Sequence, residues 1–207
     1  SVTVGYQLSY PDETISQLSP QECTKLKREG LYICMIKNPN PVAKNVTPQL
    51  SDAAFIREKV PMTKEEIRHV SICKLHLKSD SVLYDVGSGT GSIAVEAASL
   101  SDDMEVYAIE QKENAVQLIT QNKEKHGLEN IHVINAKAPD GMDNLPVPTH
   151  AFIGGSGGNL KEIIEALKAK NPHIRIVINA ISMETICEIK EILSAYDVKN
   201  EDIVQLQ

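Results

Sequence analysis

The stretch Val82-Leu-Tyr-Asp-Val-Gly-Ser-Gly-Thr-Gly91 decides the fold of this chain. Its first half is apolar and β-branched enough to predict a buried strand, and a helix is expected directly after Gly91. Glycines let the main chain turn tightly and approach a ligand without a side chain in the way. The N-terminus of the next helix adds free N–H groups and a positive dipole end. This order of strand, glycines and helix favours a cofactor loop over a merely tight turn.

Strands and helices alternate on both sides of this loop. Upstream, Thr63-Lys-Glu-Glu66 fits a capping box that opens a helix running to about Leu77. The alternation predicts a mostly parallel sheet with helices on both faces, and in such sheets ligands bind beyond the carboxyl ends of the strands. Further strands are expected at 106–109, 131–134, 150–153, 174–178 and 203–206, and helices through 94–98 and at 114–126 (before Gly127), 160–170 and 183–195 (capped by Ser182).

Residues 1–48 have a different character from the rest. They contain one convincing strand, Leu31–Ile36, which ends at Asn38-Pro-Asn-Pro41. A single strand has no partner for its backbone donors, so this region alone is not expected to form a domain. The chain therefore divides into an N-terminal extension with a linker (1–48) and a main domain (49–207). Because the sequence opens at Ser1 rather than Met, we expect a fragment of a longer protein.

Composition excludes several classes of protein. A formal net charge of −7 argues against duplex DNA as the main partner, although a local basic pocket remains compatible with it. No apolar run approaches the roughly 18 residues of a membrane span, and no leader opens the chain, so a cytoplasmic location is expected. The cysteines form no CxxC pair, which predicts buried, reduced thiols and neither a metal site nor a disulfide framework. They are Cys23, Cys34, Cys73 and Cys187.

Two further signals follow neighbouring strands. Glu110 ends the second strand, nineteen residues past Gly91, where a carboxylate can accept hydrogen bonds from the ribose hydroxyls of an adenosine. After the fourth strand, Gly154-Gly-Ser-Gly-Gly158 presents backbone N–H groups that suit carboxylates, although a flexible turn has the same composition. The motif of amine-methylating enzymes, Asn-Pro-Pro-aromatic, is absent there. The first loop reads GxGxG with Ser92 in place of the third glycine of a dinucleotide fingerprint.

The order of these motifs resembles one family, the decarboxylating precorrin-6B methyltransferases. The resemblance covers about residues 50–207, and it implies a Rossmann-like class I S-adenosylmethionine methyltransferase with a mostly parallel, seven-stranded sheet whose last strand is missing here. It also implies methylation of carbon 15 of a precorrin with decarboxylation of an acetate side chain, in cobalamin biosynthesis. The segments that carry it are Lys59–Glu66, Asp85–Gly91, Val106–Glu110, Ala138-Pro139, Ile153–Gly158 and Asn179–Thr185. Gly5–Glu13, with the strand to Ile36, resembles the tail of the companion methyltransferase that acts at carbon 5.

The resemblance also implies the site. The S-adenosylmethionine contacts carried over by position are Thr63, Gly87, Ser88, Gly89, Thr90, Gly91, Glu110 and Ala138; Asp85 supports the loop or reaches the methionyl amine through water. The expected substrate loop is Gly154, Gly155, Ser156, Gly157 and Gly158, joined for substrate carboxylates by Arg57, Lys59, Lys64 or Arg68. No catalytic side chain is assigned, although His69 is a candidate proton donor. Lys137 departs from the family, which usually has an acidic residue near the adenine. The resemblance also implies a homotetramer. It implies a tetrapyrrole substrate, either a metal-free precorrin or a cobalt-precorrin.

Three other readings stay open on the sequence alone. The first is a methyltransferase of the same fold that acts on another small molecule, on RNA or on protein. The acidic net charge counts against RNA as the substrate. An NAD-binding oxidoreductase is disfavoured by Ser92 and by the missing second mononucleotide half. A noncatalytic nucleotide-binding module is the third.

Overall fold

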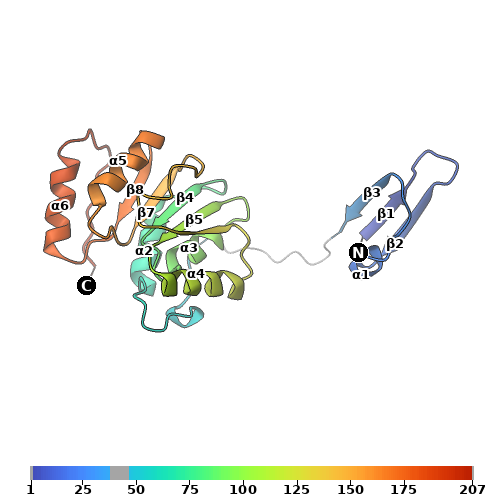
Figure 1. The fold of residues 1–207 in the computed structure, drawn as a ribbon, viewed down its shortest axis with the longest axis horizontal. Helices are drawn as coiled ribbons and strands as arrows, with labels where there is room; N and C mark the ends of the chain where they lie inside the picture. Colours follow the sequence, from blue (N-terminus) through green and yellow to red (C-terminus); the bar gives the residue numbers. More distant parts are fainter. Residues whose placement is uncertain (1, 38–46, 207) are drawn as a thin grey trace. The chain divides into compact units, whose positions relative to one another are not determined.

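The computed structural model describes residues 2–37 and 47–206, and the chain divides into two units, Ser1–Ala43 and Lys44–Gln207. In the first unit an antiparallel sheet has the order β2-β1-β3 (Figure 1). The expectation of a lone strand is therefore wrong, because β1 pairs with both neighbours along its whole length. The turn expected at 38–41 lies outside the described residues. The elements are β1 (Val2–Tyr6), β2 (Thr14–Leu18), α1 (Pro20–Cys23) and β3 (Tyr32–Ile36).

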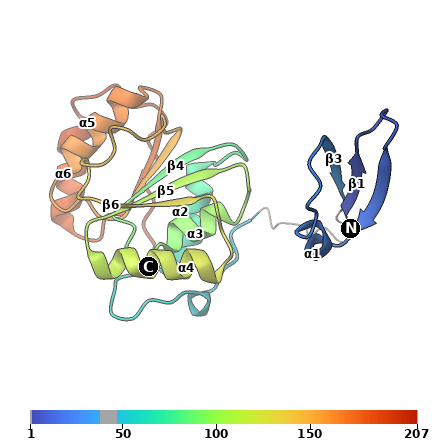
Figure 2. The same cartoon turned by 45° about the vertical axis from the view of Figure 1, so that its right-hand side comes forward.

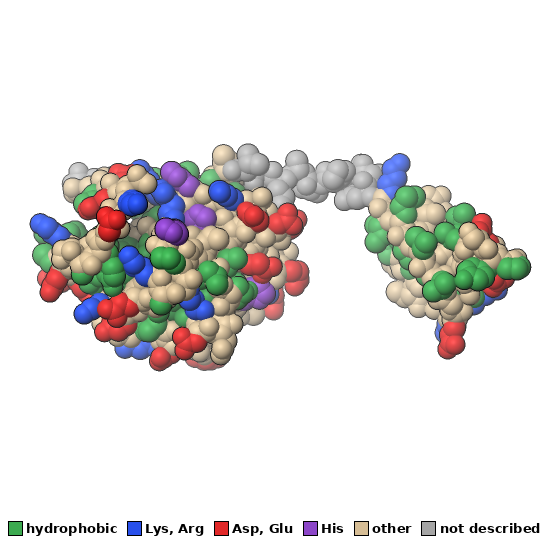
Figure 3. Space-filling model, turned by 90° about the horizontal axis from the view of Figure 1, so that it is seen from above, with side chains coloured by type: hydrophobic (Ala, Val, Ile, Leu, Met, Phe, Trp, Pro, Cys, Tyr) green, Lys and Arg blue, Asp and Glu red, His purple; other side chains and the backbone are tan. Residues whose placement is uncertain are grey.

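The central strand of this small sheet is mostly buried, whereas the two strands beside it are mostly exposed. Val2, Val4 and Tyr6 of β1 are buried, and the Arg28 guanidinium lies 4.4 Å from the centre of the Tyr6 ring. The opposite face carries exposed apolar side chains, visible on the surface of this unit in Figure 3. They include Ile15, Ile33 and Met35.

In the second unit a five-stranded sheet, all of it parallel, has the order β6-β5-β4-β7-β8. Helices α2, α3 and α4 pack on one face, and α5 and α6 on the other (Figures 1 and 2). The strands are β4 (Val82–Val86), β5 (Glu105–Glu110), β6 (Ile131–Asn135), β7 (His150–Ile153) and β8 (Arg175–Ile178). The helices are the short 3-10 turn η1 (Asp52–Ala54), α2 (Glu65–Leu75), α3 (Ser92–Ala98), α4 (Glu113–Lys125), α5 (Leu160–Lys170) and α6 (Met183–Leu193).

The two faces follow from the period-two alternation of the strands. Leu83 and Phe152 point toward α2–α4, whereas their neighbours Tyr84 and Ile153 point toward α5 and α6. The strand order reverses direction between β4 and β7, since the chain runs outward through β5 and β6 before it returns to β7 beside β4. The loops after β4 and β7 therefore meet at the switch point, where open parallel sheets bind ligands.

Most expected elements are confirmed, and three expectations need correction. Helix α2 begins at Glu65 after Lys64, and no side chain caps it, so the capping box at Thr63 is wrong. The segment 203–206 forms no strand. The resemblance implied a seven-stranded sheet without its last strand, and the described parallel sheet has five strands. Ser182 does cap α6, since its hydroxyl accepts from Thr185 N at 3.2 Å. No helix in the described ranges has the length and apolar character of a membrane span.

Candidate functional site

The two glycine-rich loops are in contact at the carboxyl edge of the sheet. Gly87 has a φ of +70°, and a Cβ on it would lie 2.3 Å from the carbonyl oxygen of Gly155. No side chain fits in that space, so glycine at 87 is required by the approach of the loop after β7. The motif after β4 and the motif after β7 thus form one surface, as expected for the switch point.

A third segment closes on the same loop. We call residues 47–63, which precede α2, the strap. Gly89 has a φ of +58°, and a Cβ there would lie 2.9 Å from the carbonyl oxygen of Pro61 in the strap. Gly91, with a φ of +78°, faces Ile119 of α4 in the same way, at 3.1 Å. At each glycine of the GxGxG motif, a side chain would therefore collide with a neighbouring atom of the protein itself.

Glu110 lies at the end of β5 and is 8% exposed. Its Oε1 accepts from the backbone N–H groups of Gln111 (2.9 Å) and Lys112 (3.0 Å), and its Oε2 accepts from Gly89 N at 2.9 Å. A carboxylate offers about four acceptor positions, so these three bonds leave one position on Oε2 free. The spacing in the sequence predicted that Glu110 and the glycine loop share one site, and the hydrogen bond from Gly89 N joins them directly.

Asp85 is fully buried beneath α3. Its Oδ2 accepts from Ser88 Oγ at 2.6 Å and from Ala94 N at 3.2 Å, which ties β4 to the loop and to the start of the helix. Burial raises the pKa of Asp85 to about 7; the two hydrogen bonds oppose that rise, and the nearby charge of Glu110 adds to it. Asp85 Oδ1 and Thr90 Oγ1 are buried without a hydrogen-bond partner in the described structure. Asp85 thus supports the loop from below.

The loop after β7 is open to solvent. Gly154, Gly155, Gly157 and Gly158 are exposed, and a Cβ at Gly155 or Gly158 would meet nothing within 4 Å. A Cβ on Gly157 would lie 3.5 Å from Cε of Lys137, so this exposed lysine, two residues after β6, lies beside the loop. Asn159 Nδ2 donates to the carbonyl of Ala138 at 3.0 Å, which brings Ala138 to the same edge.

A buried ionic network anchors the strap. Arg68 of α2 is 0% exposed; its Nε donates to Glu96 Oε2 at 3.0 Å, and its Nη1 donates to Asp52 Oδ1 at 3.2 Å and to the Thr63 carbonyl at 2.8 Å. Its Nη2 donates to the carbonyl of Leu50. Arg68 therefore does not meet a substrate carboxylate, and that expectation is wrong. The strap owes its position beside Gly89 to this network.

The other basic candidates near the strap stay predictions, with these surroundings in the structure. Lys64 pairs with Asp52 at 3.1 Å, and His69 Nε2 faces the Leu50 carbonyl at 3.3 Å and Glu96 at 3.7 Å. Arg57 and Lys59 are exposed.

Sequence reasoning missed the internal partners of the strap. Asn122 of α4 is completely buried and clamps Ile56 from both sides: its Oδ1 accepts from Ile56 N at 2.7 Å and its Nδ2 donates to Ile56 O at 2.8 Å. The same Nδ2 donates to the Thr90 carbonyl at 2.9 Å, which couples strap and glycine loop. Glu96 carried a usable signal, since it interrupts the apolar run of α3, where a charge is rare unless paired.

The cysteines are not buried as expected. Cys34, Cys73 and Cys187 are exposed and Cys23 is half-buried, all as free thiols. Their exposure follows from positions on edge β3 and on the outer faces of α2 and α6.

Comparison with known proteins places these features in a family. Residues 53–203 match the family described as precorrin methyltransferase domain. A probable cobalt-precorrin-6B C(15)-methyltransferase (decarboxylating) of Methanocaldococcus jannaschii is 43% identical over 141 residues, 68% of this chain and 74% of the relative. The cobalt-precorrin-6B C(15)-methyltransferase (decarboxylating) of Salmonella typhimurium is 36% identical over 160 residues, 76% of this chain and 82% of the relative.

A solved structure agrees. The precorrin-6y C5,15-methyltransferase of Geobacter metallireducens is 35% identical, with a TM-score of 0.69 over 74% of this chain and 82% of that one. The fold is that of the class I S-adenosylmethionine-dependent methyltransferases. Because the family match spans residues 53–63 of the strap, both glycine-rich loops and all five strands of the parallel sheet, the chain belongs to the precorrin methyltransferase family.

Proposed function

We propose that this chain transfers a methyl group from S-adenosylmethionine to carbon 15 of a precorrin or cobalt-precorrin, with loss of carbon dioxide from an acetate side chain of the substrate. The observation that carries the proposal is the meeting of four elements at one sheet edge: the GxGxG loop, Glu110, the strap and the open glycine loop after β7. The family match and the names of the relatives supply the reaction class.

The residues present fit an adenosyl cofactor. Glu110 retains one acceptor position on Oε2, which suits a ribose hydroxyl, and its other three positions are fixed by backbone amides. Thr90, within the GxGxG loop, has a buried hydroxyl without a partner among the described residues. We assign Thr63, Gly87 to Gly91, Glu110 and Ala138 to this site, with Asp85 as support. When bound, S-adenosylmethionine supplies an electrophilic methyl group on a sulfonium.

The protein's own part in the reaction is to hold the substrate. Tetrapyrrole meso carbons are electron-rich, so a precorrin needs correct placement and a dry site more than a side-chain nucleophile. Gly154 N donates to the Val86 carbonyl at 2.9 Å, so the backbone N–H groups that suit the substrate's carboxylates are those of Gly155 to Gly158, and the side chain of Lys137 lies next to them. Since the loop after β7 touches Gly87, a precorrin held there lies against the cofactor loop.

Two measurements test this proposal. Calorimetric titration with S-adenosylhomocysteine and, separately, with NAD is expected to show binding of the first and not of the second. Turnover with precorrin-6B and with its cobalt complex, followed by mass, is expected to show the gain of one methyl group and the loss of carbon dioxide. Binding of NAD alone would overturn the cofactor assignment, and binding of S-adenosylhomocysteine without turnover of either tetrapyrrole would overturn the substrate assignment.

A further inference from the structure

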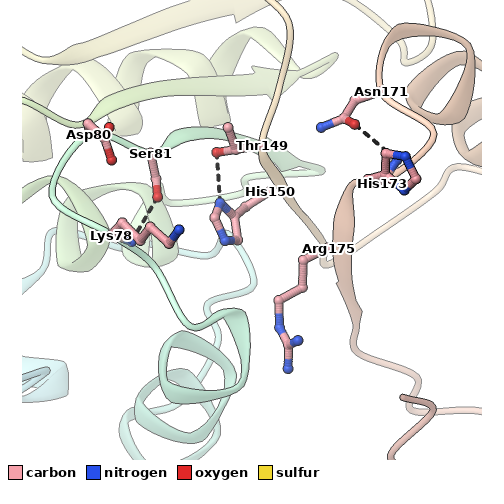
Figure 4. Close-up of a pocket in the computed structure, with 8 residues that line it drawn as sticks. All are labelled: Lys78, Asp80, Ser81, Thr149, His150, Asn171, His173 and Arg175. Atoms are coloured by element: carbon pink, nitrogen blue, oxygen red, sulfur yellow. Dashed lines mark hydrogen bonds between the residues drawn. The ribbon is translucent and has the colours of Figure 1, made fainter. Parts of the chain in front are cut away.

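A separate pocket of about 400 Å³ opens at the amino edge of the sheet, the edge opposite to the glycine loops. Its wall is built from residues at the starts of three parallel strands and in the loops that lead into them (Figure 4). Because parallel strands all begin at one edge, the loops before β4, β7 and β8 are gathered there. The lining residues are Lys78, Asp80, Ser81, Thr149, His150, Asn171, His173 and Arg175.

Positive charge predominates in this pocket although the chain as a whole is acidic. Lys78 and Arg175 are permanent cations, His173 is exposed, and Asp80 is the single acid in the described lining. Arg175 Nε donates to the carbonyl of Lys74 at 2.7 Å, which fixes the side chain and leaves its two terminal nitrogens without a partner among the described residues. A guanidinium with both terminal nitrogens free suits an oxyanion.

His150 supplies the second observation. It is 8% exposed, and its Nδ1 lies 2.8 Å from Thr149 Oγ1. Thr149 Oγ1 also lies 3.1 Å from the Val82 carbonyl oxygen. In the tautomer in which Nδ1 of His150 donates to Thr149 Oγ1, Nε2 is the unprotonated nitrogen of the neutral ring. Nε2 has no partner in the part of the chain that is described. A buried histidine thus presents an unused nitrogen beside Lys78 and Arg175 (Figure 4).

We propose that this pocket is a binding site for a small multivalent oxyanion, of the phosphate or carboxylate type, and that His150 takes up a proton at Nε2 when the anion binds. Arg175 and Lys78 supply the permanent charge, and protonated His150 adds a buried donor. Nothing in the site depends on the methyl-transfer edge of the sheet, which is formed by the opposite ends of the strands.

The electrostatics of the pocket favour a negative charge. The pKa of His150 is lowered, first by burial and then by the positive charges of Arg175, Lys78 and His76. An anion offsets the second cause, so binding and protonation are linked. His173 and Asp80 also face the pocket, so the proton uptake has to be assigned to His150 by a residue-specific signal.

Sulfate is the probe of choice, because it does not titrate between about pH 6 and pH 8. Calorimetry at constant ionic strength is expected to show saturable binding of sulfate to the whole chain, tighter at pH 6 than at pH 8. In NMR titrations the ring signal of His150 is expected to shift its midpoint to higher pH when sulfate is added. Phosphate and a tricarboxylate, run as separate arms, tell which oxyanion geometry the pocket prefers.

Matched variants locate the site. Lys78→Ala removes an exposed cation of the pocket and is expected to weaken sulfate binding about tenfold. Lys125→Ala makes the same charge change on α4, outside the pocket, and is expected to change the affinity for sulfate less than twofold. His150→Gln should remove the residue's share of the pH dependence. Equal affinities in the two lysine variants, an unmoved His150 midpoint, or no saturable binding of any of the three anions would each overturn the proposal.

Discussion

Replacing Arg68 with Met tests whether the strap is held by buried charge. The substitution keeps a long side chain in a fully buried position but removes the bonds to Glu96 Oε2, Asp52 Oδ1 and the Thr63 carbonyl. Glu96 is then a buried carboxylate without its cation. Breaking a buried pair in this way typically costs about 3–5 kcal/mol of folding free energy. We expect a loss of that size in the unfolding of the second unit by urea.

The same variant should weaken cofactor binding in the molecules that remain folded. Arg68 holds Thr63 and Leu50, and Pro61 between them lies against Gly89. Without the guanidinium the strap no longer has a fixed position at the glycine loop. We therefore expect the Kd for S-adenosylhomocysteine, measured by calorimetry without denaturant, to rise about tenfold, which corresponds to roughly 1.4 kcal/mol.

Two further variants make the test decisive. Lys64→Met removes the exposed partner of the same Asp52 and should cost less than about 1 kcal/mol, as exposed pairs do. Adding Glu96→Gln to Arg68→Met removes the orphaned charge and should recover part of the loss. If Arg68→Met destabilises no more than Lys64→Met, or leaves the affinity for S-adenosylhomocysteine unchanged, the network does not position the strap.

Three more predictions concern the site itself. Glu110→Gln places an amide N–H group opposite backbone N–H groups that now donate to the carboxylate. We expect the affinity for S-adenosylhomocysteine, measured by calorimetry, to fall at least about tenfold. An unchanged Kd would refute the assignment of Glu110 to the ribose. Burial raises the pKa of Asp85 from 3.8 to about 7. Between these two pH values the folded state holds a proton that the unfolded state releases. The free energy of unfolding therefore falls as the pH rises through this range, by at most roughly 4 kcal/mol. Urea unfolding across this range should show the slope in the parent chain and a smaller one in Asp85→Asn; parallel curves would contradict it. Lys137→Ala should raise the KM for the tetrapyrrole severalfold and leave binding of S-adenosylhomocysteine unchanged; loss of both would place Lys137 at the adenosyl site instead.

The sequence predicts those elements whose cause is local. Helix α5 has the expected bounds because Leu160, Ile163, Ile164 and Leu167 repeat at the helical period and are the residues that the helix buries. Strand β2 was missed because all of it except Leu18 is exposed, so no apolar pattern marks it, and without β2 and the distant β3 no partner was expected for β1. The expected strand at 203–206 has apolar residues but no neighbour to pair with in the described sheet.

The candidate site divides in the same way. Spacing alone placed Glu110 beside the glycine loop, since carboxyl ends of adjacent parallel strands share an edge. The burial of Arg68 was not predictable from a helix with a polar sequence, because its partners belong to other segments: Asp52 and the Thr63 carbonyl to the strap, and Glu96 to α3. An arginine is seldom buried without such partners, so single-residue rules favour the surface.

The glycines are less specific for a cofactor than their motif suggests. Gly87 and Gly89 are required by the carbonyl oxygens of Gly155 and Pro61, and that requirement would hold in a protein of this fold that binds nothing. What distinguishes a binding site is the polar capacity left over: one acceptor position on Glu110, the buried hydroxyl of Thr90, and the uncovered amides after β7. A glycine-to-alanine variant in the first loop would therefore test packing. Glu110→Gln adds no Cβ at Gly87 or Gly89 and instead changes the polar groups that hold Gly89 N and offer the free acceptor position.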